Sequence, residues 1–197
     1  MQNTVKIKDV KDIVVRFSGD SGDGMQLTGT IFSNLSAIFG NQIATFPDFP
    51  AEIRAPQGTL YGVSGFQVHL GNQIYNSGDM SDVLVAMNPA ALKVNAKSLK
   101  KDSVIIIDTD SFGKRDLEKA LFATEDPFTE LGLTTQQIIS VPITTLTKSS
   151  LEGMEMDMKS RVRSKNMFAL GLVCWLFNRP LDVANHILSN KFAKKPV

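Results

Sequence analysis

A β-rich run followed by a glycine-rich turn and a helical pattern restricts the fold of this chain more than any other feature. Residues 12–18 are rich in β-branched and aromatic side chains, and the sequence then reads Gly-Asp-Ser-Gly-Asp-Gly over residues 19–24. From residue 25 to residue 39, apolar side chains recur at helical spacing, and residues 42–46 form a second β-rich run. A strand, a tight turn, a helix and a strand in this order open a nucleotide-binding α/β fold.

The same alternation returns in the second half of the chain. We therefore predict an α/β, Rossmann-like domain with a mostly parallel sheet flanked by helices. Asn88 and Pro89 have the residue types of an N-cap and a first helical position. Further strands are expected at residues 83–87, 103–107 and 138–143. Further helices are expected at residues 90–99, 112–123, 144–151, 161–177 and 181–192.

The segment between these two halves interrupts the pattern. Three prolines fall within residues 46–57, which disfavours a helix and a central strand there. Residues 60–70 are expected to be extended, and Gly71-Asn72 has the composition of a two-residue hairpin turn into residues 73–75. We therefore predict an antiparallel β-hairpin inserted into the sheet.

Length, charge and cysteine content limit the class of protein. The 197 residues suit a single domain, and 21 basic against 20 acidic residues give a formal charge of +1, so no general attraction to nucleic acid or anionic membrane is expected. The longest apolar stretch, residues 167–177, is too short to cross a bilayer, and the N-terminus has no secretory apolar core. The single Cys174 excludes an internal disulfide, a Cys-based iron–sulfur cluster and a Cys-rich zinc site. A cytoplasmic location is the simplest expectation.

The turn made of Gly19, Asp20, Ser21, Gly22, Asp23 and Gly24 is the first candidate binding element. Glycines let a ligand approach the backbone, and the free N–H groups of the following helix favour a phosphate. The G-x-x-G-x-G spacing is neither the dinucleotide fingerprint nor a P-loop, and its two aspartates are negative. Two interpretations remain open: a purely structural turn, or a turn facing a ligand or a cationic group of a partner. The Gly22-Asp23-Gly24 triplet lacks the later Asn pair of a complete thiamine-diphosphate site.

The proline-rich loop supplies the second candidate. Its prolines make it stiff, and Arg54 follows the second strand, near the edge of the sheet where ligands bind in such folds. Arginine binds phosphate or carboxylate through two hydrogen bonds. The alternative interpretation is a surface ion pair between Arg54 and Glu52.

Other polar residues carry weaker signals, and we predict neither a catalytic residue nor a metal ligand. Asp108 and Asp110 follow a central strand, where a ligand contact and a turn or helix cap are both compatible with the pattern. His69 is expected to be structural and His186 to lie on the surface. Cys174 is expected to be a buried, inert thiol.

Three stretches together resemble the gamma-type domain of the 2-oxoacid:ferredoxin or flavodoxin oxidoreductases. They are residues 16–24, residues 46–56 and residues 58–68. A fourth, residues 165–171, resembles the Asn-Met helix of that family. The similarity covers nearly the whole chain and is nearest to the N-terminal part of the alpha subunit of 2-oxoglutarate:ferredoxin oxidoreductase.

The resemblance implies a non-autonomous part of an enzyme that decarboxylates a 2-oxoacid, here 2-oxoglutarate, and transfers the acyl group to coenzyme A. It implies that thiamine diphosphate, Mg²⁺ and an iron–sulfur cluster belong to partner alpha and beta domains or subunits, that ferredoxin accepts the electrons, and that the assembly is a hetero-oligomer such as a dimer of heterodimers. By position, residues 19–24, Arg54 and Gly58 would contact coenzyme A.

Two other function classes remain as alternatives. An independent nicotinamide-dependent oxidoreductase would need a dinucleotide fingerprint, and Asp48 could serve as its acidic residue after the second strand. A purely structural interaction module would use the apolar helix and the Met-rich loop to bury a partner. Fused relatives continue beyond the gamma-type domain, so residues 1–197 can also be a fragment of a longer alpha subunit.

Overall fold

The computed structural model describes residues 9–52 and 54–193. Ile53 of the proline-rich stretch and residues 194–197 therefore lie outside the described residues. Within the described part, six strands form one sheet in the order β2-β3-β1-β4-β5-β6. The strands are β1 (Asp12–Asp20), β2 (Gln42–Asp48), β3 (Val63–Gly71), β4 (Ser81–Ala86), β5 (Leu99–Asp108) and β6 (Gln137–Val141). Strands β1, β4, β5 and β6 are mutually parallel, and β3 runs antiparallel between β1 and β2.

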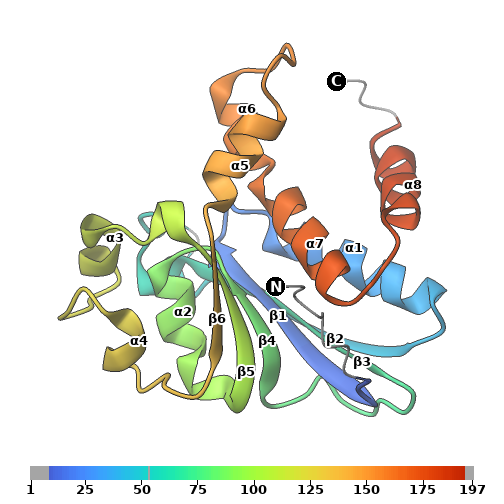
Figure 1. The fold of residues 1–197 in the computed structure, drawn as a ribbon, viewed down its shortest axis with the longest axis horizontal. Coiled ribbons are helices and arrows are strands. Elements are labelled where there is room, and N and C mark those ends of the chain that lie inside the picture. Colours follow the sequence, from blue (N-terminus) through green and yellow to red (C-terminus); the bar gives the residue numbers. More distant parts are fainter. Residues whose placement is uncertain (1–8, 53, 194–197) are drawn as a thin grey trace, which may run out of the picture.

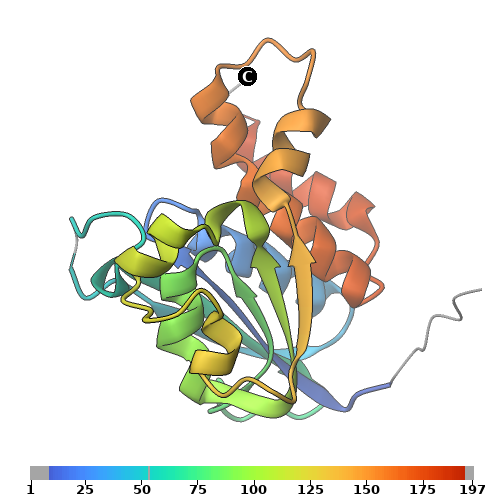
Figure 2. The ribbon, with the colours of Figure 1, turned by 60° about the vertical axis from the view of Figure 1, so that its left-hand side comes forward.

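Helices cover both faces of the sheet and its upper edge. Figure 1 shows α1, α7 and α8 on one face and α2, α3 and α4 on the other. Helices α5 and α6 project beyond the carboxyl ends of the strands (Figure 2). The helices are α1 (Met25–Ile38), α2 (Pro89–Asn95), α3 (Lys114–Lys119), α4 (Pro127–Glu130), α5 (Ile143–Ser150), α6 (Met158–Arg163), α7 (Lys165–Leu176) and α8 (Leu181–Phe192). Among the described residues, no helix has the length and apolarity that a bilayer crossing requires.

Each face of the sheet carries its own apolar core, because successive side chains of a strand point to opposite faces. The core under α1 and α7 contains Phe17, Phe32 and Val68, all without exposed surface. The core under α2 contains Leu84 and Ile105, which are also fully buried. The carboxyl edge of the sheet presents the loops that leave β1, β4 and β5.

The predicted fold class is confirmed: the structure is a mixed α/β sheet with helices on both faces. The predicted helix start is confirmed as well, because Asn88 Oδ1 accepts a hydrogen bond from Ala91 N at 2.8 Å and Pro89 is the first helical residue. Pro47 lies within β2, which is compatible with its lack of an N–H because β2 is an edge strand.

The predicted partner of the antiparallel insertion was wrong. Residues 73–75 form no strand. Of residues 60–70, which were expected to be extended, Leu60–Gly62 form a short 3-10 helix instead, and the strand runs from Val63 to Gly71. Strand β3 pairs with β1 on one side and with β2 on the other, so both of its hydrogen-bonding edges are filled by segments earlier in the chain. A local hairpin partner therefore has no edge to bind.

The predicted single helix at residues 161–177 was also wrong. The structure has two helices there, α6 and α7, with Ser164 as the last cap of one and the first cap of the other. Several boundaries also differ; for example, β5 begins at Leu99 rather than at residue 103, and α2 ends at Asn95 rather than at residue 99. The short helix α4 follows Asp126, whose carboxylate accepts the N–H groups of Phe128 and Thr129.

Candidate functional site

The glycine-rich turn closes upon itself through its two aspartates. The N–H of Asp23 donates to the carbonyl of Asp20 at 2.9 Å, and the N–H of Asp20 donates to Asp23 Oδ2 at 3.0 Å. Gly19 is required by this geometry, since a Cβ there would come within 2.7 Å of Asp23 Oδ2. Gly24 has φ +75°, a conformation that favours glycine, and leads directly into α1.

The proline-rich loop is docked onto this turn. The N–H of Gly58 donates to both carboxylate oxygens of Asp20, at 3.1 Å each. The N–H of Ser21 donates to the carbonyl of Gly62, also at 3.1 Å. The structure thus brings together two predicted site elements, the 19–24 turn and Gly58, that are separate in sequence.

Arg54 lies on the exposed part of the same loop. Its side chain forms no ion pair among the described residues, so the alternative pairing with Glu52 is not present there. Glu52 instead ties the loop together through its backbone, since its N–H donates to the carbonyl of Tyr61 at 3.2 Å and its own carbonyl accepts the N–H of Ala55. The guanidinium is accessible to an anionic ligand.

The first turn of α7 contacts the glycine turn from the other side. Lys165 Nζ lies 2.8 Å from Asp23 Oδ1, and both side chains are almost buried, at 13% and 12% exposed. Asn166 Nδ2 donates to the carbonyl of Gly24 at 3.5 Å, and the hydroxyl of Thr28 donates to the carbonyl of Asn166 at 3.4 Å. Lys165 and Asn166 were not among the predicted site residues. Their position in the segment that resembles the Asn-Met helix was the available signal.

The surroundings of Asp20 alter its acidity. Burial raises the pKa of its carboxyl, and the negative charge of Asp23 raises it further. The hydrogen bond from Gly58 N–H, the side chain of Asn88 and the charge of Lys165 oppose this increase in pKa. The stability of the ionised form of Asp20 therefore depends on these neighbouring groups.

A second polar cluster holds the base of the proline-rich loop. Arg16 is 9% exposed, forms an ion pair with Asp48 at the end of β2, and donates to Gln67 Oε1 at 3.3 Å. The side-chain amide of Gln26 donates to the carbonyls of Asp48 and Gly65, at 3.1 and 2.7 Å. Sequence reasoning missed this cluster, because residues 16 and 48 meet only through the pairing of β1, β3 and β2.

The acidic residues after β5 have a structural role. Asp108 is fully buried and accepts hydrogen bonds from the N–H and the hydroxyl of Thr144, at 3.2 and 2.6 Å. Asp110 accepts the N–H and the hydroxyl of Thr145 in the same way. Both carboxylates thus fix the start of α5, which supports the helix-cap interpretation over a ligand contact.

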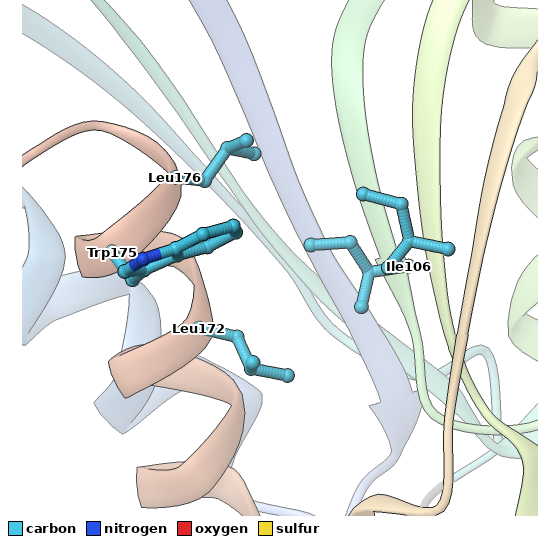
Figure 3. Close-up of a pocket in the computed structure, with 5 residues that line it drawn as sticks. Ile106, Leu172, Trp175 and Leu176 are labelled. Carbon is cyan, nitrogen blue, oxygen red and sulfur yellow. The ribbon is translucent and has the colours of Figure 1, made fainter. Parts of the chain in front are cut away.

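An apolar pocket lies apart from these polar groups, beside β5 and β6. It is lined by Ile106, Ile139, Leu172, Trp175 and Leu176. Figure 3 shows the three α7 side chains Leu172, Trp175 and Leu176 opposite Ile106. Trp175 is 73% exposed. None of the lining side chains is titratable, so this pocket has no acid–base chemistry of its own.

Taken together, the polar site has the groups of a binding surface. Ser21, Gly22 and Arg54 are exposed, whereas Asp20, Asp23 and Gly58 are held inward by mutual contacts. Among the described residues, no group of three or more His, Cys, Asp or Glu side chains could hold a metal ion. Arg54 is thus an exposed cation beside a turn whose two carboxylates are held inward.

Comparison with known proteins links this chain to one family. The sequence matches the family described as "Pyruvate ferredoxin/flavodoxin oxidoreductase" over residues 14–197. It is 47% identical over 188 residues to the 2-oxoglutarate oxidoreductase subunit KorA of Mycobacterium tuberculosis, covering 95% of this chain and 29% of that protein. It is 29% identical over 110 residues to the pyruvate/ketoisovalerate oxidoreductases common subunit gamma of Pyrococcus abyssi, covering 54% of this chain and 57% of that one.

Solved structures share the fold. The 2-oxoglutarate:ferredoxin oxidoreductase of Magnetococcus marinus, described with 2-oxoglutarate, coenzyme A and succinyl-CoA bound, superimposes with a TM-score of 0.71 and 26% identity. The match covers 96% of this chain and 28% of that chain. The gamma subunit of a keto/oxoacid ferredoxin oxidoreductase from Geobacter sulfurreducens has a TM-score of 0.64 at 20% identity, covering 92% of this chain and 85% of that one. The chain spans less than a third of the M. tuberculosis and M. marinus relatives, and it belongs to the pyruvate ferredoxin/flavodoxin oxidoreductase family.

Proposed function

We propose that residues 1–197 form one gamma-type domain of a 2-oxoglutarate:ferredoxin oxidoreductase. The domain contributes to assembly and positions coenzyme A while the complete enzyme oxidatively decarboxylates the 2-oxoacid to acyl-CoA and CO₂. The observation that carries this proposal is the match, over 96% of this chain, to an enzyme described with 2-oxoglutarate and coenzyme A bound. The 47% identity to a 2-oxoglutarate oxidoreductase subunit supports the same substrate.

The candidate site divides into contact residues and supporting residues. Ser21, Gly22 and Arg54 are exposed and are the proposed contacts with coenzyme A, whose phosphates a guanidinium can bind through two hydrogen bonds. The supporting residues turn their polar groups toward one another and hold the turn and the loop in register. They are Gly19, Asp20, Asp23, Gly24 and Gly58.

This chain is proposed to hold coenzyme A and to leave the redox groups to its partners. An iron–sulfur cluster needs several thiolates, and the chain has one cysteine, Cys174, which is fully buried. No group of three or more His, Cys, Asp or Glu side chains in the part of the chain that the structure describes could hold a metal ion, so these residues do not fit Mg²⁺ with thiamine diphosphate either. We therefore assign thiamine diphosphate, Mg²⁺ and the cluster to partner alpha and beta domains or subunits.

Partner contacts are part of the same proposal. Exposed Trp175 beside an apolar pocket is typical of a surface that another polypeptide covers. We propose that the partner is another domain or subunit of the same oxidoreductase, that ferredoxin accepts the electrons from the assembled enzyme, and that the complex works in the cytoplasm.

Isothermal titration with coenzyme A tests the binding role. We expect Arg54→Ala to weaken the affinity of the assembled enzyme by about tenfold, the usual effect of losing one charge-assisted contact. The matched control is Arg115→Ala, which removes an exposed arginine from α3. Equal affinity of the wild type and Arg54→Ala would remove Arg54 from the site.

Two further measurements separate this proposal from its alternatives. Tight binding of NADH to the chain would favour an independent nicotinamide-dependent enzyme. Turnover of a 2-oxoacid by the purified chain alone would contradict a non-autonomous role.

A further inference from the structure

The glycine turn contains two carboxylates close together, and an almost buried cation of α7 lies against it. Asp20 and Asp23 lie three residues apart, and Asp23 is only 12% exposed in its side chain. Lys165 Nζ lies 2.8 Å from Asp23 Oδ1, and the charge of Lys165 also acts on Asp20. A single ammonium from α7 therefore pairs directly with Asp23 and acts more weakly on Asp20.

The same groups form a continuous path from α7 to the proline-rich loop. Lys165 contacts one oxygen of Asp23, and the other oxygen of Asp23 accepts the N–H of Asp20 at 3.0 Å. The carboxylate of Asp20 then accepts the N–H of Gly58 at 3.1 Å. Each contact along this path uses a different acceptor oxygen, so the contacts do not compete with one another.

Removing the cation would break this path at its first step. A carboxylate left without its partner in a nearly buried place is strongly unfavourable, whereas removing both charges together is far less so. Without Lys165, Asp23 and Asp20 would repel each other as like charges. The turn can relieve that repulsion by moving Asp20 toward solvent, which releases Gly58.

We propose that Lys165 is a positioning residue that holds Gly58 and its loop against the glycine turn through Asp23 and Asp20. Lys165 does not contact the loop itself in any of the hydrogen bonds or ion pairs of the described residues. The consequence for coenzyme A rests on the function proposed above, because Arg54 lies on the loop that Lys165 holds in place.

Amide hydrogen exchange at Gly58 tests the path directly. In Lys165→Met, which keeps an unbranched side chain of nearly the same length and removes its charge, we expect the Gly58 N–H to exchange about tenfold faster than in the wild type. The matched control is Lys100→Met, which breaks another Lys–Asp pair with a 2.8 Å contact, Lys100–Asp82, on β5 and β4. An unchanged Gly58 exchange rate in folded Lys165→Met overturns the proposal.

A double variant tests whether the charge of Asp23 mediates the effect. Asn at position 23 can still accept the N–H of Asp20, so Lys165→Met/Asp23→Asn is expected to recover most of the Gly58 protection, and Lys165→Arg to retain it. Recovery of folding in the double variant, should the single one fail to fold, also supports the proposal. The proposal is overturned if the effects of the two substitutions on Gly58 exchange simply add, or if the double variant fails to fold.

Coenzyme A affinity, measured for the assembled enzyme carrying the same variants, separates this inference from the proposed function. We expect Lys165→Met to weaken binding by about tenfold and the double variant to restore it. A shift in Gly58 exchange without a shift in affinity leaves the positioning role intact and contradicts the coenzyme A assignment. No shift in exchange contradicts the positioning role, whatever the affinity.

Discussion

The side chain of Asn166 lies directly over Gly24, so that a Cβ at Gly24 would overlap the amide of Asn166. This contact joins the start of α7 to the start of α1, because Asn166 Nδ2 also donates to the carbonyl of Gly24. Glycine is needed at position 24 for two reasons: the backbone has a φ of +75°, and α7, from the far end of the chain, approaches it closely.

Gly24→Ala is accordingly expected to lower the free energy of unfolding by about 1–3 kcal/mol, from the left-handed backbone and the overlap with Asn166. Urea denaturation measures this change in the free energy of unfolding. The control is Gly22→Ala, where a Cβ meets nothing within 4 Å, and where we expect a change within about 0.5 kcal/mol. Equal losses in the two variants would show that the contact with Asn166 is unimportant.

A second pair of glycines tests packing inside helices. A Cβ at Gly29 of α1 would overlap the ring of Phe66 on β3, whereas a Cβ at Gly171 of α7 meets nothing within 4 Å. Overpacking outweighs the gain in helix propensity at the first site, so Gly29→Ala is expected to destabilise by about 1–2 kcal/mol. Gly171→Ala is expected to stabilise by about 0.5–1 kcal/mol. Thermal unfolding compares the two, and a stabilising Gly29→Ala would contradict the close approach of α1 to the sheet.

Local patterns were sufficient for the elements that depend on neighbouring residues. The run before Gly19, the buried strands β4 and β5 and the cap at Asn88 are each specified within about ten residues, and each is present. The glycine turn was also recognisable, because a strand that ends in glycines before a helical pattern has few other structures available.

Contacts between segments that lie far apart in the sequence could not be predicted from local patterns. Both edges of strand β3 form hydrogen bonds, one edge with β1 and the other with β2. No local turn signal at Gly71 could indicate this pairing. The break at Ser164 contains neither proline nor glycine, and it places Lys165 and Asn166 against a turn some 140 residues earlier. The residues that hold the candidate site together are thus the ones whose partners lie far away in sequence.

The ion pair between Arg16 and Asp48 is expected to respond differently to the loss of each partner. Arg16 is almost buried, whereas the Asp48 side chain is 40% exposed and can be hydrated when left alone. Asp48→Asn, which leaves the almost buried guanidinium without a carboxylate, should destabilise by about 2–3 kcal/mol, and Arg16→Met by about 1 kcal/mol. Urea denaturation of both variants checks the order, and a larger loss in Arg16→Met would contradict it.

Cys174 is expected to be unreactive in the folded protein. Burial raises the pKa of its thiol from 9.0 to about 11, against a smaller opposing effect of Arg179. At pH 8 the thiolate fraction is then about a hundredfold lower than in the unfolded chain, in addition to the steric protection of a fully buried side chain. Labelling with a maleimide should be slow in buffer and fast in urea. Equal labelling rates would contradict the buried position.

The last prediction concerns Asp20 and the pH dependence of stability. Burial raises the pKa of Asp20 above its ordinary value of 3.8, so the folded chain binds this proton more tightly than the unfolded chain does. The group therefore stabilises the fold fully below pH 3.8, and this contribution is lost as the pH rises through the raised pKa. Asp20→Asn removes this titration and keeps an oxygen that can accept the N–H of Gly58. The advantage of the wild type over Asp20→Asn should thus shrink as the pH rises.

Asp126 provides a control of opposite sign for that experiment. The hydroxyl and the N–H of Thr129 lower the pKa of the Asp126 carboxyl, so its contribution is present above pH 3.8 and is lost as the pH falls through the lowered pKa. The advantage of the wild type over Asp126→Asn should therefore grow with pH. Urea denaturation at several pH values, starting below 4, gives both differences. Slopes of the same sign for the two variants would contradict the burial of Asp20 beneath the proline-rich loop, because a hydrated carboxylate that accepts N–H groups would behave as Asp126 does.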